Sequence, residues 1–171
     1  GWLDEFLKGG FVPILQTNRG CPFKCAFCHS GDLYFNKLSQ FYLDRVLQEI
    51  EYIASRTNSH SLNVSDNNFG ILKRDEQISQ KLADMKEKYG WPLNTVIDTS
   101  KTNKRQVADS ISPIKHIMMI NLSVQSMNPD TLTAIKRKNL SFGEYHEMIN
   151  MLEENQIPSV AELIVPMPEE T

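Results

Sequence analysis

The sequence predicts an α/β fold in which parallel strands alternate with helices along the chain. Short apolar runs at 11–17, 62–64, 96–97, 117–124 and 160–165 indicate strands, and the stretches between them carry apolar residues at helical spacing. Units of about thirty to forty residues, each a strand followed by a helix, favour a parallel sheet with right-handed crossovers. At 171 residues the chain is long enough to bury the core of one domain.

The first residues are predicted to link the core to a preceding domain and not to form part of the core. Residues 1–7 are predicted to form a short amphipathic helix that ends at Gly9 and Gly10. We interpret 1–10 as a linker helix from a preceding domain, and 11–171 as the core domain, incomplete at its C-terminus.

Two helices are predicted on either side of the second strand. The first begins near Ser39, a suitable N-cap, and runs to about Ser55, and the second ends at Gly90. Between the second strand and the second helix lies the polar run 65–70, Ser-Asp-Asn-Asn-Phe-Gly. Its composition alone predicts a solvated turn rich in Asx side chains.

The third and fourth strands are followed by polar residues. The third ends in the run 98–101, at the position where a βα loop faces the active centre in barrel-like folds. Within this run, Lys101 is expected to be a solvated lysine. A short helix is predicted around 107–111, and the methionines Met118 and Met119 of the fourth strand are expected to fill the core.

The last two helices carry clear start signals. Asn128 and Pro129 are typical of an N-cap followed by the first helical residue, and this helix is predicted to end with the cations 136–138. Those cations would complement the helix dipole or face water. Ser141 and Glu144 have the spacing of a capping box before the helix that leads to the fifth strand.

Composition and charge limit the classes of function. The chain is 40% hydrophobic and 23% charged with a net charge of −3, which is ordinary for a globular protein and gives no reason to expect nucleic acid as a partner. No apolar run is long enough to span a membrane, so no membrane partner is expected. The chain begins without methionine, and we interpret it as a piece of a longer protein. Free thiols favour a reducing, cytoplasmic location.

Three cysteines, Cys21, Cys25 and Cys28, lie close enough together for one loop to aim all three sulfurs at a common point. Thiolates are the ligands of iron–sulfur clusters and of zinc, whereas a disulfide would leave an odd thiol. A cubane [4Fe–4S] cluster held by three cysteines would have one iron open to a small molecule. A zinc site that includes His29 is the alternative, although zinc ligands are rarely adjacent in sequence.

The pattern Cys-x3-Cys-x2-Cys, with the aromatic Phe27 before the last cysteine, resembles the signature of the radical S-adenosylmethionine (SAM) enzymes. The wider run 17–25 is similar to the subgroup that often carries an upstream cobalamin-binding domain. The resemblance implies a partial TIM-type (β/α) barrel, truncated here after the fifth strand. It also implies that the open iron binds SAM, and that electron transfer from the reduced cluster cleaves SAM into methionine and a 5′-deoxyadenosyl radical. The resemblance spans nearly the whole chain, but only the cysteine motif is highly specific.

The same resemblance implies a set of SAM contacts. The cysteines would hold the cluster, and the residues after the second strand would bind the SAM amino group. The fourth strand would meet the ribose or methionine end, a cation would pair with the SAM carboxylate, and apolar residues would lie beside the adenine. Asp66 and Asn67 would bind the amino group, and Ser123 and Gln125 would meet the ribose or methionine end. Arg137 would pair with the carboxylate, and Phe27 and Ile164 would lie beside the adenine. The chain departs from the family pattern at Pro166 and Glu169, where glycines are usual.

The function implied is radical SAM chemistry on an unknown substrate, with cobalamin-dependent methyl transfer as an elaboration and cobalamin bound outside this chain. A reductant such as flavodoxin or ferredoxin would be a partner. Two other functions stay open, namely a non-catalytic zinc- or iron–sulfur-binding module and an electron carrier, which should use four protein ligands. A truncated barrel exposes an edge and apolar surface, which predicts self-association.

Overall fold

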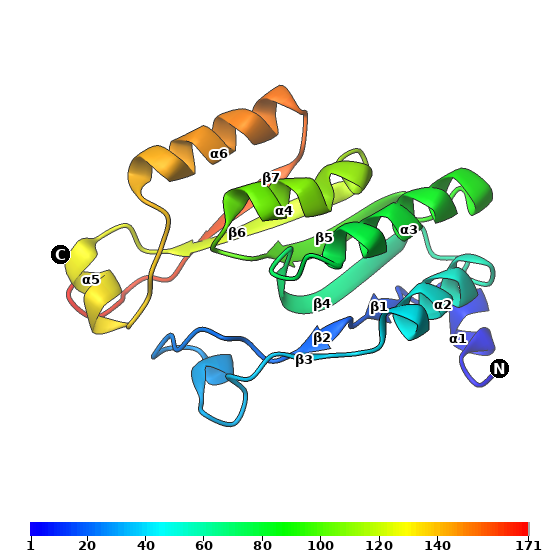
Figure 1. Ribbon diagram of the computed structural model, residues 1–171, viewed down its shortest axis with the longest axis horizontal. Coiled ribbons are helices and arrows are strands. Elements are labelled where there is room, and N and C mark those ends of the chain that lie inside the picture. The colour runs from blue at the N-terminus through cyan, green and yellow to red at the C-terminus, as the bar shows by residue number, and fades with distance from the viewer. Residues whose placement is uncertain (171) are drawn as a thin grey trace.

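Five parallel strands form the main sheet, in the order β1–β4–β5–β6–β7 (Figure 1). The structure is a computed structural model that describes residues 1–170. The strands are β1 (Ile14–Leu15), β4 (Ser61–Phe69), β5 (Asn94–Thr99), β6 (Met118–Gln125) and β7 (Ser159–Leu163). This arrangement confirms the predicted α/β fold with a parallel sheet.

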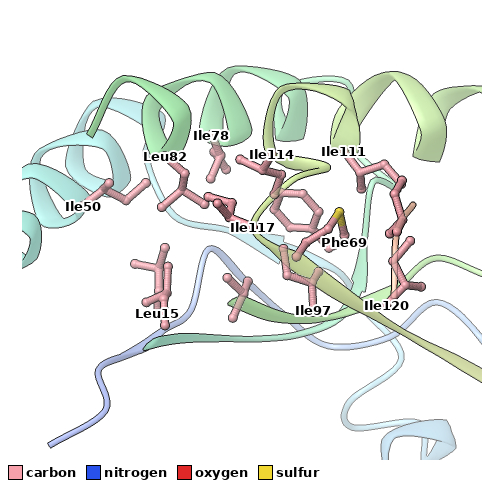
Figure 2. Packing of buried hydrophobic residues seen from close by; sticks show 14 of the residues in the cluster. Leu15, Ile50, Phe69, Ile78, Leu82, Ile97, Ile111, Ile114, Ile117 and Ile120 are labelled. Atoms are coloured by element: carbon pink, nitrogen blue, oxygen red, sulfur yellow. The ribbon is translucent and has the colours of Figure 1, made fainter. Parts of the chain in front are cut away.

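Helices cover one face of this sheet and leave the other uncovered (Figure 1). The covering helices are α2 (Leu43–Ala54), α3 (Asp75–Tyr89), α4 (Lys104–Ile111) and α6 (Phe142–Glu154). Figure 2 shows the core between the two layers, where Phe69 and Ile97 of the sheet meet Ile78 and Leu82 of α3. On the opposite face, Ile14 remains 68% exposed. The sheet is therefore sealed on one side only, as in one wall of a barrel.

The remaining elements are short. They comprise α1 (Asp4–Lys8), β2 (Asn18–Arg19), the 3-10 helix η1 (His29–Gly31), β3 (Ser39–Gln40), the 3-10 helix η2 (Ser112–Ile114) and α5 (Pro129–Ala134). The antiparallel pair β2–β3 lies apart from the main sheet, and the cysteines lie between these two strands in sequence. Among residues 1–170, no helix is both long and apolar enough to cross a membrane.

Two predicted boundaries before α3 are wrong. Ser39 does not cap a helix, because Ser39 and Gln40 pair with Arg19 and Asn18 and so close the cysteine loop. Helix α2 begins only at Leu43, without a side-chain cap. The polar run after Val64 is not a solvated turn, since β4 continues through it to Phe69 and buries Asp66, Asn68 and Phe69.

The later elements agree better with the sequence. Asn128 caps α5, and Ser141 forms a capping box with Glu144 at the start of α6. Helix α5, however, ends at Ala134, and Lys136 has a positive φ of 54°, so the cations that follow do not lie in its last turn. Only one of the two methionines of β6 fills the core. Met118 is buried, whereas Met119, on the opposite face of the strand, is 38% exposed.

Candidate functional site

The cysteine loop runs from the end of β2 to η1 and is held by backbone hydrogen bonds. Cys21 N donates to the carbonyl of Phe35 (3.0 Å), and Cys28 N donates to the carbonyl of Cys25 (3.1 Å), which makes a tight turn. Ala26 N donates to the carbonyl of Ile135 (2.9 Å) and so attaches the loop to the end of α5. Cys21 and Cys25 are buried, and Cys28 is exposed.

Two glycines allow the backbone of this loop to pack closely. Gly20 has a φ of +91°, and a Cβ there would lie 2.1 Å from the carbonyl oxygen of Lys37. A Cβ on Gly31 would lie 2.5 Å from the carbonyl oxygen of Cys25. Both approaches are to backbone atoms, which cannot rotate away as a side chain can. Side chains at these two positions would therefore displace the loop that carries the sulfurs.

Asp66 anchors the segment that leads into the loop. Its Oδ1 accepts from Thr17 N (2.8 Å) and Asn18 N (3.2 Å), and its Oδ2 accepts from Asn18 Nδ2 (2.7 Å) and from the Thr17 hydroxyl. Burial raises the pKa of Asp66 above its usual value, and these hydrogen bonds oppose that rise because they favour the charged form. Arg74 Nη2 adds a bond to the Thr17 carbonyl (2.7 Å).

One buried side chain contacts a cysteine sulfur directly. Asn68, on the same strand and face as Asp66, donates from Nδ2 to Cys21 Sγ at 3.1 Å. Asn68 is 1% exposed, and its Oδ1 has no hydrogen-bond partner among the described residues. Asn68 was not among the site residues predicted from the sequence. Had the polar run been interpreted as a strand, the period-two alternation would have put it on the same face as Asp66.

Two cations face the cysteines from the far side of the loop. The Arg137 guanidinium lies near Cys25, with Nη1 3.9 Å from Sγ. Burial lowers the pKa of both Arg137 and Lys101, and attraction to the three cysteines opposes that shift in each case. Lys101 also lies 5.9 Å from the centroid of the Phe23 ring. The expectation of a solvated Lys101 is therefore wrong, because this side chain is partly buried beside the cysteines.

Several of the predicted SAM contacts come together near Arg137. Its guanidinium donates from Nε to Asn139 (2.6 Å) and from Nη2 to the carbonyl of Ser123, and it lies 5.9 Å from the Phe27 ring. The backbone of Ile164 joins the same group, because Ile164 N donates to the carbonyl of Gln125 (3.1 Å).

The predicted SAM-contact residues on β4 and β6 differ in whether their polar atoms are already bonded within the protein. Gln125 has a positive φ of 68°, is buried, and leaves Oε1 without a partner among the described residues. The Ser123 hydroxyl contacts Glu162 at 3.4 Å. Asn67 is exposed and donates to the Ser30 hydroxyl at 3.4 Å, whereas both oxygens of Asp66 are occupied by protein donors. Asn67 is thus the more open of the two β4 candidates.

By their chemistry, three thiolates on one loop suit an iron–sulfur cluster or a zinc ion. Tetrahedral zinc would bring its sulfur ligands within about 3.8 Å of one another. In the described part of the chain, no group of three His, Cys, Asp or Glu side chains is placed to hold one metal ion. A cavity of about 440 Å³ adjoins the loop, with Cys25, Phe27 and Cys28 in its wall.

Comparison with protein families gives a match over residues 15–171 to the model of the Radical SAM superfamily. Over 165 residues the chain is 35% identical to the cobalamin-dependent radical SAM methyltransferase TokK of Streptomyces tokunonensis. It is 36% identical to the 2-(S-pantetheinyl)-carbapenam-3-carboxylate methyltransferase of Streptantibioticus cattleyicolor. Each match covers 94% of this chain and 24% of the relative, so the chain spans about a quarter of the length of these relatives.

Solved structures share the fold. The radical SAM methyltransferase TsrM from Kitasatospora setae, solved with cobalamin and a [4Fe–4S] cluster bound, aligns with a TM-score of 0.79 at 18% identity. The alignment covers 98% of this chain and 33% of TsrM. The cobalamin-dependent radical enzyme OxsB aligns with a TM-score of 0.68 at 14% identity, over 95% of this chain and 25% of OxsB. These similarities confirm the predicted barrel-type α/β fold.

Proposed function

Because this chain belongs to the radical SAM superfamily, we propose that the protein cleaves SAM reductively at a [4Fe–4S] cluster held by Cys21, Cys25 and Cys28. The observation that carries the proposal is that one loop presents three free thiols close enough to the partly buried Lys101 and the buried Arg137 to attract both cations. When bound, the cluster supplies an electron and an open coordination site for SAM.

The chain's own residues would orient SAM by charge and shape. Arg137 is fixed by bonds to Asn139 and to the backbone of β6, and it has guanidinium N–H groups to spare for the SAM carboxylate. Asn67 has an exposed amide for the amino group, and Gln125 Oε1, without a hydrogen-bond partner in the described residues 1–170, is available to the ribose. Phe27 and Ile164, 38% and 39% exposed, offer apolar surface to the adenine.

Methyl transfer with cobalamin is the elaboration that we propose for the whole protein. It is supported by the names of two relatives at 35% and 36% identity, one described as a cobalamin-dependent radical SAM methyltransferase and the other as a methyltransferase. The residues described here would supply the cluster and SAM sites, and cobalamin would bind to a domain outside this chain. A reductant of the flavodoxin or ferredoxin type would deliver the electron.

The competing proposal is a zinc- or iron–sulfur-binding module without catalysis, and metal analysis of the full-length protein separates the two. After anaerobic reconstitution we expect about four irons and four acid-labile sulfides per protein, as the cubane formula requires. Replacing Cys21, Cys25 or Cys28 by Ala should abolish the cluster. His29→Ala is the matched control and should retain it, since a cluster held by three cysteines does not need the histidine.

Turnover provides the second measurement. With dithionite or reduced flavodoxin, the reconstituted protein should convert SAM to 5′-deoxyadenosine, and added cobalamin should become methylated at the expense of SAM. One equivalent of zinc without sulfide, lost in His29→Ala, would establish the zinc module instead. A full cluster without any SAM cleavage would favour the electron carrier.

A further inference from the structure

The contact between Asn68 and Cys21 links the main sheet to the cysteine loop. Asn68 belongs to β4, and Cys21 lies 47 residues earlier in the sequence, yet Nδ2 approaches Sγ to 3.1 Å. Both side chains are buried, with 1% and 6% of their surfaces exposed. Water therefore does not compete strongly for either partner, and the bond joins a fixed donor to a fixed sulfur.

The orientation of the amide follows from chemistry. A cysteine that binds a metal does so as a thiolate, whose sulfur accepts hydrogen bonds but cannot donate them. The opposite orientation of the Asn68 amide would direct the carbonyl dipole at a negative sulfur, which is unfavourable. The N–H side must therefore face Cys21 when the loop carries its cluster.

Core stability does not explain an asparagine at this position. Asn is disfavoured in strands, and Asn68 Oδ1, which has no hydrogen-bond partner within residues 1–170, has the desolvation cost of a buried acceptor. The neighbouring inward residue Phe69 and the earlier Val64 are apolar and fully buried on the same strand. An aliphatic residue would pack at position 68 without that cost, so the feature that the amide adds is its N–H donor.

We propose that Asn68 sets the reduction potential of the cluster through its N–H···S bond to the Cys21 thiolate, an inference that rests on the proposed function. Reduction adds one electron, whose charge is spread partly onto the cysteine sulfurs, and a hydrogen-bond donor stabilises the more negative state. The electron comes from an external reductant of the flavodoxin type. No covalent bond forms or breaks, and the amide protons stay on Nδ2.

Arg137 acts on the same sulfurs in a different way. Its Nη1 lies 3.9 Å from Cys25 Sγ, and its other nitrogens bond Asn139 and the backbone of β6. At that distance its effect is mainly that of a nearby positive charge. Asn68 has no charge, so its influence depends on the directed N–H···S bond alone. Asn68 is thus a positioning and tuning residue, since it acts through Cys21.

The test is a redox titration of the reconstituted full-length protein followed by electron paramagnetic resonance. In Asn68→Leu, which keeps the approximate shape and removes the donor, we expect the ratio of reduced to oxidised cluster at a fixed potential to fall roughly tenfold. That change is a 59 mV lower midpoint for a one-electron couple. Asn63→Leu is the matched control, because Asn63 lies exposed on the same strand, and it should keep the wild-type midpoint.

A second measurement covers the case in which Asn68→Leu does not hold a cluster. Pulsed electron paramagnetic resonance of the wild-type protein labelled with ¹⁵N at asparagine side chains should detect a labelled nitrogen coupled to the reduced cluster. The absence of this coupling, or an unchanged midpoint in Asn68→Leu, would overturn the inference and leave the proposed function intact. A wild-type protein that assembles no cluster would overturn both.

Discussion

Removing the Asp66 carboxylate should loosen the start of the cysteine loop more than any change to its partners. The side chain accepts from two backbone amides, a hydroxyl and a side-chain amide, all on Thr17 and Asn18. Asp66→Ala leaves these donors without an acceptor in a buried site. Each stranded donor costs about 1–3 kcal/mol, which gives at least about 4 kcal/mol in total.

Part of this cost is offset, because the substitution also removes a carboxylate that is unfavourable to bury. Burial raises the pKa of Asp66, which reflects this desolvation of the ionised form. We therefore expect a net loss of about 3 kcal/mol in the free energy of local opening. Hydrogen exchange measured by mass spectrometry on the full-length protein reports this quantity. The backbone amides of Thr17 and Asn18 should exchange roughly 150-fold faster, since about 1.4 kcal/mol is a factor of ten.

Thr17→Val is the matched comparison, because it keeps the branched shape and removes only the hydroxyl donor to Asp66. It should cost about 1 kcal/mol, which is roughly a fivefold faster exchange. Exchange within threefold of wild type in Asp66→Ala would refute the reasoning. It would mean that water satisfies these donors, and that the carboxylate is not what holds the loop.

Three further predictions follow from the structure. Gly20→Ala should lower the iron content after reconstitution, because its Cβ would lie 2.1 Å from the Lys37 carbonyl oxygen; normal iron content would show that the loop can shift without harm. Burial raises the pKa of Asp75 from 3.8 to about 6, so its folded form binds protons more tightly than the unfolded chain. Its contribution to stability should accordingly fall as pH rises from about 4 to about 6, and urea unfolding of Asp75→Asn should show a flatter pH dependence; parallel curves would contradict this. Ser141→Ala should cost about 1 kcal/mol by removing the capping box with Glu144, measured by urea unfolding, while the iron content stays normal.

The sequence predicted the elements whose signals are local. The Asn128 cap, the capping box at Ser141 and the left-handed Gly90 depend on side chains within a few residues, and the structure confirms all three. The cysteine spacing is likewise a local pattern, and it led to the family. The parallel sheet followed from the alternation of apolar runs with helices, which is a general property of α/β folds.

The parts that could not be predicted depend on contacts distant in sequence. Ser39 looks like an N-cap until its pairing with Arg19 is known. The run from Ser65 to Asn68 is too polar for a strand by composition, and only the donors on Thr17 and Asn18 make burial of Asp66 acceptable. The partly buried position of Lys101 depends on the cysteine loop folding over it, which no local pattern records.

The division of the domain at residue 10, the self-association of the truncated barrel and the individual SAM contacts stay predictions. Strand β7 leaves all five of its residues exposed at the edge of the sheet, which is the surface that self-association would use. Size-exclusion chromatography with light scattering would measure it.

The uncovered face of the sheet changes character along its length. Val96 and Met119 are partners on one rung of neighbouring strands, and two residues further on, Asp98 and Asn121 are partners on the next rung of the same face. This face of the sheet is thus apolar around Val96 and Met119, and it is polar around Asp98 and Asn121, nearer the cysteines. The cysteine loop is held by Asp66 and Asn68 of β4 as well as by the pair β2–β3, whereas Asp98 and Asn121 lie on β5 and β6. Substitutions at Asp98 and Asn121 would therefore leave the bonds from Asp66 and Asn68 to the cysteine loop in place.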